Sequence, residues 1–315
     1  MDIGFGRLAM TACAAALIAA SAAAGAAERI PIIDAHSQIG DAVAPERIIA
    51  LMDAAGVTRT ILAARRKTTV RSMVALARRH PDRITAAVRT KGGAYQNKPP
   101  RAFRDFLAKQ MKFPEFAAMA EVLIFHAEKR DRKGRRVAPQ VAFPPGHEKV
   151  AIALDAALKR GWPFVVHIEF ASVGAGRAAY MAQLETMLGA NPRHPFVLNH
   201  MGQLGPEEVT RLIRAHPNLY FIPAHSNPVT AARSREPWTE MFAGRRLSPP
   251  WRALVMRYPE RFVLGFDNVW ARHWENLYLP QVALWRDALA DLPGDVAHAV
   301  AHGNAERLWR LPPAR

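Results

Sequence analysis

The chain has 315 residues, of which 50% are hydrophobic, so it can bury a large core as one barrel-sized domain or two smaller ones. Its formal net charge of +16 predicts an anionic partner without naming it. The only cysteine is Cys13, so a chain that lost its first residues would have no disulfide, thiolate nucleophile or cysteine-bound metal. We expect a single domain, because no Ser/Gly-rich or Pro-rich linker divides the chain.

Residues 1–27 have the layout of a secretory signal peptide. Arg7 precedes an uncharged apolar run, and small residues follow from Ala22 to Ala27. A membrane anchor is the alternative, but an Ala-rich run that ends in A-x-A favours removal. We therefore expect a mature domain of residues 28–315 that is periplasmic or secreted, with no stable membrane anchor after signal cleavage.

Eight short apolar or β-branched runs follow, and segments of helical period separate them. The predicted strands are residues 30–36, 58–64, 83–89, 118–126, 163–170, 195–201, 219–225 and 261–267. Two of the helical patterns are residues 44–57 and residues 70–83, and the helix in the second pattern is expected to end before Pro81. This rhythm predicts an α/β fold, a (β/α)8 TIM barrel, although an open doubly wound sheet has the same alternation. Residues 294–311 predict an extra C-terminal helix outside the closed ring.

Polar residues gather at the C-terminal ends of these predicted strands. His36, His167, His200 and Asp267 follow apolar runs in the first, fifth, sixth and eighth strands. The C-terminal ends of parallel barrel strands meet at one mouth, so these residues are expected to converge on one cavity. Imidazole and carboxylate groups are ligands for a divalent metal such as zinc. A single histidine of this kind is better explained as a satisfied core residue, but three with an aspartate favour a metal site.

The first strand also carries a row of polar residues in the stretch "DAHSQ". Asp34, His36 and Gln38 are spaced by two, and side chains alternate along a strand, so we expect all three on one face.

These motifs resemble the amidohydrolase superfamily in its amidohydrolase-2 branch of metal-dependent TIM-barrel hydrolases. The resemblance covers residues 30–311 and rests on the stretches "DAHSQ", "VVHIE", "LNHMG", "YPERFVLGFDNVW" and "GNAERLWRL". It implies a divalent metal, zinc or else manganese, as one or two ions. The implied ligands are His36, His167 and Asp267, with His200 as a ligand to a second ion or a polariser of the substrate carbonyl.

Gln38 departs from the family pattern, because the second histidine of H-x-H would fall at this position. An amide oxygen is a poorer ligand than imidazole for such a metal. Three explanations are open. Gln38 binds the metal through its carbonyl oxygen, another residue replaces the missing histidine as a ligand, or the protein has lost the metal. Glu121 supports the second reading: it lies in the fourth strand, on the face of Met119 and Leu123 by alternation, and resembles the metal-bridging Glu of TatD-like deoxyribonucleases. The alternative for Glu121 is a salt bridge with Arg89 or Lys91.

Asp267 is the expected general acid and base, the role that the family assigns to it. Its alternatives are capping the next turn and orienting His36.

Cations follow several predicted strands and should surround the mouth. Those after the second and third strands are Arg65, Arg66, Arg89 and Lys91. We expect them to contact a small anionic substrate, such as a carboxylate or phosphate ester, with Arg65 or Arg89 as the direct contact. The basic stretch at 128–136 contains no aromatic residue, so no nucleic acid is expected as a partner.

The sequence therefore predicts an exported metal-dependent hydrolase that acts on an anionic ester, lactone, amide or phosphate. Two rivals use the same barrel: a metal-free lactonase or decarboxylase, and a periplasmic binding protein without catalysis. Substrate, metal count and oligomeric state depend on loop conformations that patterning does not determine.

Overall fold

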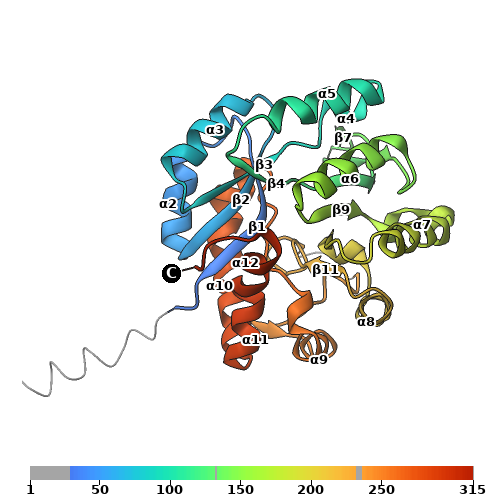
Figure 1. Ribbon diagram of the computed structural model, residues 1–315. Helices are drawn as coiled ribbons and strands as arrows, with labels where there is room; N and C mark the ends of the chain where they lie inside the picture. The colour runs from blue at the N-terminus through green and yellow to red at the C-terminus, as the bar shows by residue number, and fades with distance from the viewer. Residues whose placement is uncertain (1–28, 132, 232–235, 315) are drawn as a thin grey trace, which may run out of the picture. The chain divides into compact units, whose positions relative to one another are not determined.

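Strands and helices alternate along the chain, and the helices form an outer layer around the strands (Figure 1). The computed structural model describes residues 29–131, 133–231 and 236–314. The predicted signal peptide with Cys13 lies outside these residues. Among the helices of the described ranges, none has the length and apolar character needed to span a membrane.

The strands form two sheets with parallel pairing. The first sheet has the order β1 (Ile32–Ile39), β2 (Val57–Ala64), β3 (Ile84–Val88) and β4 (Phe116–Met119). The second has the order β11 (Leu219–Ile222), β10 (Phe196–Asn199), β9 (Phe164–Ile168), β5 (Val122–His126) and β8 (Val141–Ala142), of which only β8 is antiparallel to its neighbour. Consecutive strands thus lie side by side, as in the predicted TIM barrel.

The fourth predicted strand, 118–126, is broken into β4 and β5. The partner changes at the break, because β4 pairs with β3 and β5 pairs with β9. The break lies at Ala120 and Glu121, so strand alternation does not carry across it. Ala120 belongs to the core of the barrel, yet Glu121 faces the same interior. The expected alternation therefore holds on one side of the break only: Leu123 lines the same cavity as Glu121, and Met119 does not.

The eighth predicted strand, 261–267, is an extended segment rather than a regular strand. One bridge joins Phe262 to Phe221 of β11. On the other side, the Ala35 amide donates to Leu264 O at 3.0 Å, and the Asp267 amide donates to His36 O at 2.7 Å. The segment connects the two sheets and completes the ring, but its ladder with β1 is interrupted by an irregularity in that strand.

The irregularity is a bulge in β1. Asp34 pairs with Thr60 and Ser37 with Leu62, so β1 has one residue more than β2 over this stretch. The bulge separates Asp34 from the row predicted with His36 and Gln38. The Asp34 carboxylate accepts from Ser37 Oγ at 2.5 Å and from the Phe266 amide at 2.9 Å, and contacts no site carboxylate or imidazole ring. The predicted row is therefore correct for His36 and Gln38, which reach the mouth, and wrong for Asp34, which does not.

The helices and short hairpins have the following bounds. The α-helices are α2 (Pro45–Ala55), α3 (Val70–Arg79), α4 (Gly93–Gln96), α5 (Pro100–Gln110), α6 (Glu148–Arg160), α7 (Arg177–Ala190), α8 (Pro206–Ala215), α9 (Pro249–Arg257), α10 (Tyr278–Ala290), α11 (Gly294–His298) and α12 (Asn304–Trp309). Single turns of 3-10 helix cover Phe170–Ser172, Gly174–Gly176, His200–Gln203 and Pro259–Arg261, and π turns cover His273–Leu277 and Ala299–Gly303. The hairpins are β6 (Lys129–Arg130) with β7 (Arg136–Ala138) and β12 (Phe242–Ala243) with β13 (Arg246–Leu247).

The barrel interior is built from alanines and β-branched residues and is continuous with α12. One buried cluster contains Ile33, Ala35, Ile61, Ala63, Ala87, Ala118, Ala120, Val165, Val197, Ile222, Ala224 and Val263 from the ring, together with Ala305, Leu308 and Trp309 from α12. The predicted extra C-terminal helix is present as α12, and its buried side chains pack against the barrel core. Interior alanines leave a space that the side chains of α12 share, since a core tolerates few voids.

Gly265 tests how closely the connecting segment packs. A Cβ there would lie 2.9 Å from Ile222 Cγ2 and 3.3 Å from the His36 amide nitrogen. We expect Gly265→Ala to lower the free energy of unfolding by about 1–3 kcal/mol through overpacking, measured by urea titration. In the control Gly189→Ala, in α7, the new Cβ meets no heavy atom within 4 Å, so the helix should gain about 0.5–1 kcal/mol. Equal stability of Gly265→Ala and wild type would contradict the packing.

Candidate active site

A cavity of about 850 Å³ opens at the mouth, the end of the barrel where the C-terminal strand ends meet. Every predicted site residue except His36 lines it, and His36 lies against the carboxylates of Glu121 and Asp267. The prediction of one shared cavity is therefore confirmed.

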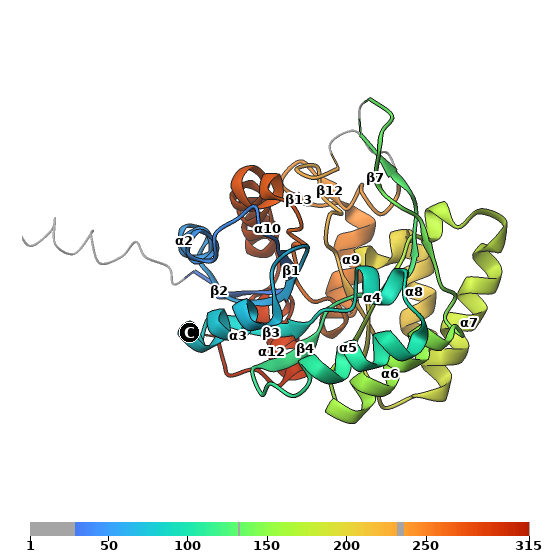
Figure 2. The same ribbon diagram turned by 90° about the horizontal axis from the view of Figure 1, so that it is seen from above.

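One wall of the cavity is formed by the β6–β7 hairpin. Lys129, Val137, Ala138 and Pro139 line the cavity, and the hairpin that carries β7 projects from the rest of the unit (Figure 2). Of the described residues in the 223–251 loop, only His225 lines the cavity.

Glu121 is the centre of the site and is only 1% exposed. Its Oε2 accepts from the Asn199 amide at 2.6 Å and lies 2.9 Å from His167 Nδ1. Its Oε1 receives the Lys91 ammonium and lies 3.5 Å from His36 Nε2. The salt bridge expected as an alternative for Glu121 is thus present with Lys91, and the same carboxylate also faces two imidazoles.

Asp267 is the second buried carboxylate. The Gln38 amide donates to its Oδ1 at 2.9 Å, and His36 Nε2 lies 3.3 Å from the same oxygen. His200 Nε2 lies 3.3 Å from Oδ2. Gln38 therefore lies in the site, but it presents its amide nitrogen and orients Asp267.

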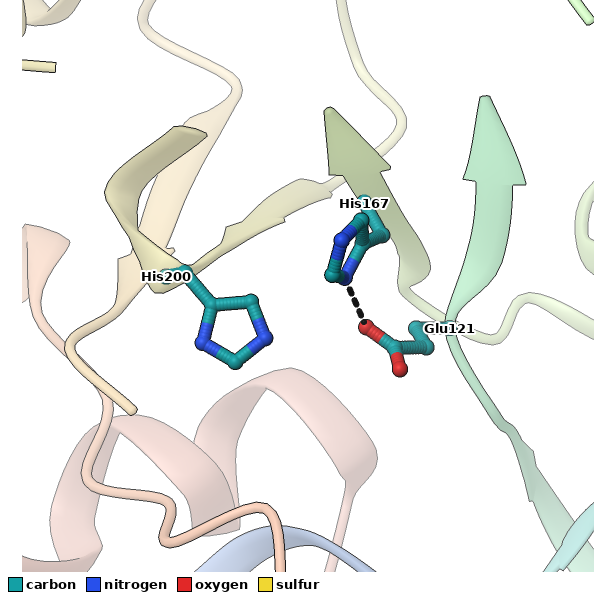
Figure 3. A group of neighbouring side chains, drawn as sticks. All are labelled: Glu121, His167 and His200. Atoms are coloured by element: carbon teal, nitrogen blue, oxygen red, sulfur yellow. Dashed lines mark hydrogen bonds and ion pairs between the residues drawn. The ribbon is translucent and has the colours of Figure 1, made fainter. Parts of the chain in front are cut away.

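Possible ligand atoms form four overlapping groups among the described residues, and two of these groups share Glu121. The two groups without Glu121 are His126 with His167 and Glu169, and His200 with His225 and Asp267. The first donor group is His36, Glu121 and Asp267, and the second donor group is Glu121, His167 and His200 (Figure 3). Within each group the ligand atoms lie within 4.8 Å of one another, and all five residues of the first and second donor groups are buried.

In the second donor group, each imidazole ring has a hydrogen-bond partner on the side away from Glu121. This contact determines which ring nitrogen keeps its lone pair. His200 Nδ1 donates to Ala224 O at 2.9 Å, and His167 Nε2 lies 3.2 Å from Glu169 Oε1. A ring with one proton then directs the lone pair of His200 Nε2 and of His167 Nδ1 toward carboxylate oxygens. The lone pair of His200 Nε2 also has the Asn199 amide as a donor at 3.2 Å, whereas the lone pair of His167 Nδ1 faces Glu121 Oε2, a contact that needs a proton or a metal ion between the two atoms. The chemistry of these donors therefore fits a divalent metal.

The carboxylates also control the protonation of the imidazoles. Burial lowers the pKa of His36, but the charges of Glu121 and Asp267 outweigh it and raise the pKa to about 9. Burial likewise lowers the pKa of His167, and Glu121 with Glu169 raises it to about 9. Burial raises the pKa of Glu121, but Lys91, His167 and His36 hold it well below the usual range.

Several residues of the mouth have left-handed backbone conformations. The φ angles are +52° at His200, +59° at His225 and +45° at Asp267. Such angles are costly for residues other than glycine, and they persist where the surrounding structure holds them. At Asp267, His225 Nε2 donates to the backbone carbonyl at 3.1 Å.

The predicted cations differ in what they contact. Arg65 stacks on Trp270, with its Cζ 3.8 Å from the ring centroid, and Arg66 lies over the same ring at 4.7 Å. The Arg89 guanidinium donates to the backbone carbonyls of Lys91 and Arg66. Arg65 is therefore the cation best placed for a substrate, because Arg89 supports a loop and Lys91 pairs with Glu121.

Sequence reasoning missed Glu169, Asn199 and Trp270. Glu169 accepts from Lys129 Nζ at 2.7 Å and from the Ala127 amide at 2.8 Å, so it ties the base of the hairpin to His167. Its spacing of two from His167 was an available signal. Asn199 and Trp270 carried none, because their contacts depend on the turns that follow their strands.

Comparison with known proteins identifies the family. The sequence profile of the family described as Amidohydrolase matches residues 18–311. The chain belongs to this family. Membership places it among enzymes of the metal-dependent hydrolase and decarboxylase superfamily, and confirms the resemblance drawn from the motifs. A comparison with curated proteins finds no match.

Solved structures similar to this amidohydrolase share its fold at low sequence identity. An uncharacterised TIM-barrel protein from Bordetella bronchiseptica has a TM-score of 0.57 at 15% identity, covering 89% of this chain and 99% of that one. A phosphotriesterase homology protein from Escherichia coli, with phosphate in its active site, has a TM-score of 0.56 at 13% identity, covering 89% of this chain and 98% of that one. An amidohydrolase from Burkholderia multivorans with bound zinc has a TM-score of 0.52 at 16% identity, covering 89% of this chain and 99% of that one. They establish the TIM-barrel fold.

The raised pKa values predict how metal-free protein responds to pH. Protonated His36 and His167 stabilise the folded state fully below their ordinary pKa of 6.5, and this contribution is lost as pH rises through about 9. We expect the free energy of unfolding of chelator-treated protein, measured by urea titration, to fall across that window. Glu121→Gln removes the shared anion and should flatten the decline. A wild-type profile that is flat between these pH values would contradict the charge arrangement.

Proposed function

We propose that this amidohydrolase is a metal-dependent hydrolase that acts on a small anionic ester, lactone, amide or phosphate ester. The proposal rests on His167 and His200. One nitrogen of each imidazole ring contacts Glu169 or the Ala224 carbonyl, and this contact directs the other ring nitrogen toward a carboxylate oxygen of Glu121 or Asp267. The bound zinc of the Burkholderia structure and the phosphate of the Escherichia structure support the same reading.

The residues that would hold the ion are Glu121, His167 and His200, with Asp267 beside them. Zinc, or manganese as the alternative, would act there as a Lewis acid that polarises the bond to be broken and makes water more acidic.

Asp267 is the group that moves a proton. Its carboxylate is buried, its Oδ1 is held by the Gln38 amide, and its Oδ2 faces His200. Burial and the charge of Glu121 raise the pKa of Asp267, but bonds with His200 and His36 hold it well below the usual range, so the group is an ionised acceptor. It accepts a proton from attacking water and returns it to the leaving group.

Arg65 binds the anionic part of the substrate. Trp270 fixes its guanidinium by stacking, and its Nη1 donates only a long bond of 3.5 Å, to Val269 O. A planar guanidinium with free N–H groups recognises a carboxylate or phosphate through paired hydrogen bonds. The β6–β7 hairpin closes one side of the cavity and limits the access of bulk water.

A metal-free lactonase is the second candidate. The ion pair of Lys91 with Glu121, and the imidazoles beside both carboxylates, compensate the buried charges without any metal. Export to the periplasm, or secretion, remains part of the proposal through the predicted signal peptide.

The function test is turnover on a panel of esters, lactones, amides and phosphate esters, half of each class carrying an additional anionic group. Chelator should abolish turnover, and zinc or manganese should restore it. Carboxylated aromatic compounds, with released carbon dioxide as the readout, test decarboxylation in the same assay. Turnover that survives complete metal removal would select the metal-free candidate.

Asp267→Asn tests the proton transfer. An amide cannot accept the proton, so we expect kcat to fall by about 10²- to 10⁴-fold on the best substrate, with a smaller change in KM. The folded state is checked by circular dichroism. An unchanged kcat would remove Asp267 from the chemistry.

Arg65→Met tests anion recognition. Loss of a charge-assisted bond should raise KM for anionic substrates by about 10- to 100-fold and leave neutral analogues unaffected. Arg130→Met is the matched control, because Arg130 lies on the hairpin and pairs with Glu128 outside the cavity lining. Equal effects of both variants would point to net charge rather than to direct contact.

A further inference from the structure

We propose that a second cavity, at the end of the barrel opposite the mouth, binds a small zwitterion that carries a carboxylate and an ammonium group, as an α-amino acid or a short peptide does. The site is built on a buried arginine, Arg59, and an exposed aspartate, Asp82, which line one cavity without pairing with each other. It lies apart from the catalytic residues and does not rest on the proposed function.

The second cavity has a volume of about 750 Å³ and lies where β2 and β3 begin. Its lining comes from the C-terminal end of α2, from the starts of these two strands, and from residues 312–314 after α12. Met52, Val57 and Arg59 are buried, whereas Asp82 and Pro312 are exposed. The cavity therefore has a buried base and an exposed rim, and it shares no lining residue with the cavity at the mouth.

Arg59 forms the charged part of the buried base. Side chains alternate along β2, and Ile61 and Ala63 belong to the barrel core, so Arg59 faces the same interior. Arg59 is only 8% exposed. Its Nη1 donates to Pro81 O at 3.0 Å and to Thr85 Oγ1 at 3.2 Å. These bonds fix the position of the side chain and use one of its three nitrogens.

The rest of the Arg59 guanidinium has no partner among the described residues. Nε and Nη2 carry three of the five N–H groups, and no hydrogen bond or ion pair joins them to this part of the chain. A buried charge in this state is unfavourable unless an anion or an acceptor compensates it. Nε and Nη2 together form the edge of a guanidinium that binds a carboxylate through two parallel hydrogen bonds. The carboxylate of the ligand therefore belongs on this edge.

Arg83 and Asp53 neutralise each other in the same cavity. Arg83 Nη1 lies 2.7 Å from Asp53 Oδ1, and Arg83 Nε and Nη2 donate to the carbonyls of Thr58 and Val57. All three nitrogens of this guanidinium are engaged, and the pair adds no net charge. Arg59 and Asp82 remain as the cation and the anion that a ligand would meet.

Asp82 makes the cavity better suited to a zwitterion than to a simple anion. Burial lowers the pKa of Arg59, and the charge of Asp82 opposes this shift, so the two groups are near each other. Within the described ranges, however, no ion pair joins them. The charge of Asp82 disfavours a phosphate or a lone carboxylate but attracts an ammonium group beside it. A ligand with both groups would satisfy Arg59 and Asp82 together, with Met52 and Pro312 against its aliphatic part.

The experiment is isothermal titration calorimetry of the purified full protein with leucine and with two analogues that each lack one charge. N-Acetyl-leucine keeps the carboxylate and loses the ammonium group, and leucinamide keeps the ammonium group and loses the carboxylate. We expect leucine to bind with a dissociation constant below about 10 mM, and each analogue to bind at least about 10-fold more weakly.

Two variants locate the binding. Asp82→Asn should weaken leucine about 10-fold and remove its advantage over N-acetyl-leucine, because the partner of the ammonium group is lost. Arg59→Lys keeps the buried charge but loses the edge with two nitrogens, and it should weaken leucine by a similar factor. Asp105→Asn is the matched control for Asp82→Asn, because Asp105 is exposed on α5 outside both cavities, and it should leave leucine binding unchanged.

Other outcomes decide against the site or define its ligand. Absence of binding by leucine and by leucylleucine up to about 10 mM would refute the proposal. N-Acetyl-leucine that binds as tightly as leucine would show a simple anion site and would also refute it. Binding that survives unchanged in Asp82→Asn and in Arg59→Lys would place the ligand elsewhere. Tighter binding of leucylleucine than of leucine would support the site and identify a short peptide, rather than a free amino acid, as its ligand.

Discussion

The mouth depends on a single constraint, the burial of the Glu121 carboxylate inside the barrel. An ionised carboxylate that is 1% exposed is strongly unfavourable unless charges and hydrogen bonds compensate it. Its partners come from four strands or strand ends: His36, Lys91, His167 and Asn199. Most of the other geometry of the site can be understood as the means of bringing these partners to one carboxylate.

The backbone meets this demand by breaking strand alternation where the ligands lie. Ala35 is a core residue of the barrel, and the bulge in β1 lets the next residue, His36, face the interior as well. Ala120 and Glu121 form a similar pair at the break between β4 and β5. Left-handed backbone conformations at His200 and Asp267 extend this irregularity around the mouth. The regular, alanine-rich interior below the mouth supplies the rigid support that such strain requires.

The other residues of the mouth shape the entrance to the cavity and make it positively charged. The β6–β7 hairpin forms a wall of the cavity, and Glu169 joins its base to His167 through Lys129. A change in the hairpin therefore reaches a candidate ligand through two contacts. Arg65, stacked on Trp270, places a cation in the same cavity. An anionic substrate would thus meet a basic mouth before it meets the two buried carboxylates.

Periodicity was sufficient to predict alternating strands and helices, because this alternation is a local property of the chain, but it left a barrel and an open doubly wound sheet as alternatives. The sequence also identified most of the candidate residues, because polar groups at the ends of apolar runs stand out in a sequence, but it missed Glu169, Asn199 and Trp270. It did not predict that 118–126 is broken, that 261–267 lacks a regular ladder, or that Asp34 leaves the site. Those features depend on which strand pairs with which, and pairing is a long-range property.

The sequence by itself determined that this chain is an α/β barrel of the Amidohydrolase family with histidines and carboxylates at its mouth. Only the tertiary structure decided the role of each polar group. Glu121, Lys91 and Gln38 are far apart along the chain, and a carboxylate is a metal ligand, an ion-pair partner or both according to what lies within 3 to 4 Å of it. That distance is set by the packing of the barrel, which brings β1, the loop after β3 and the break after β4 to the same point.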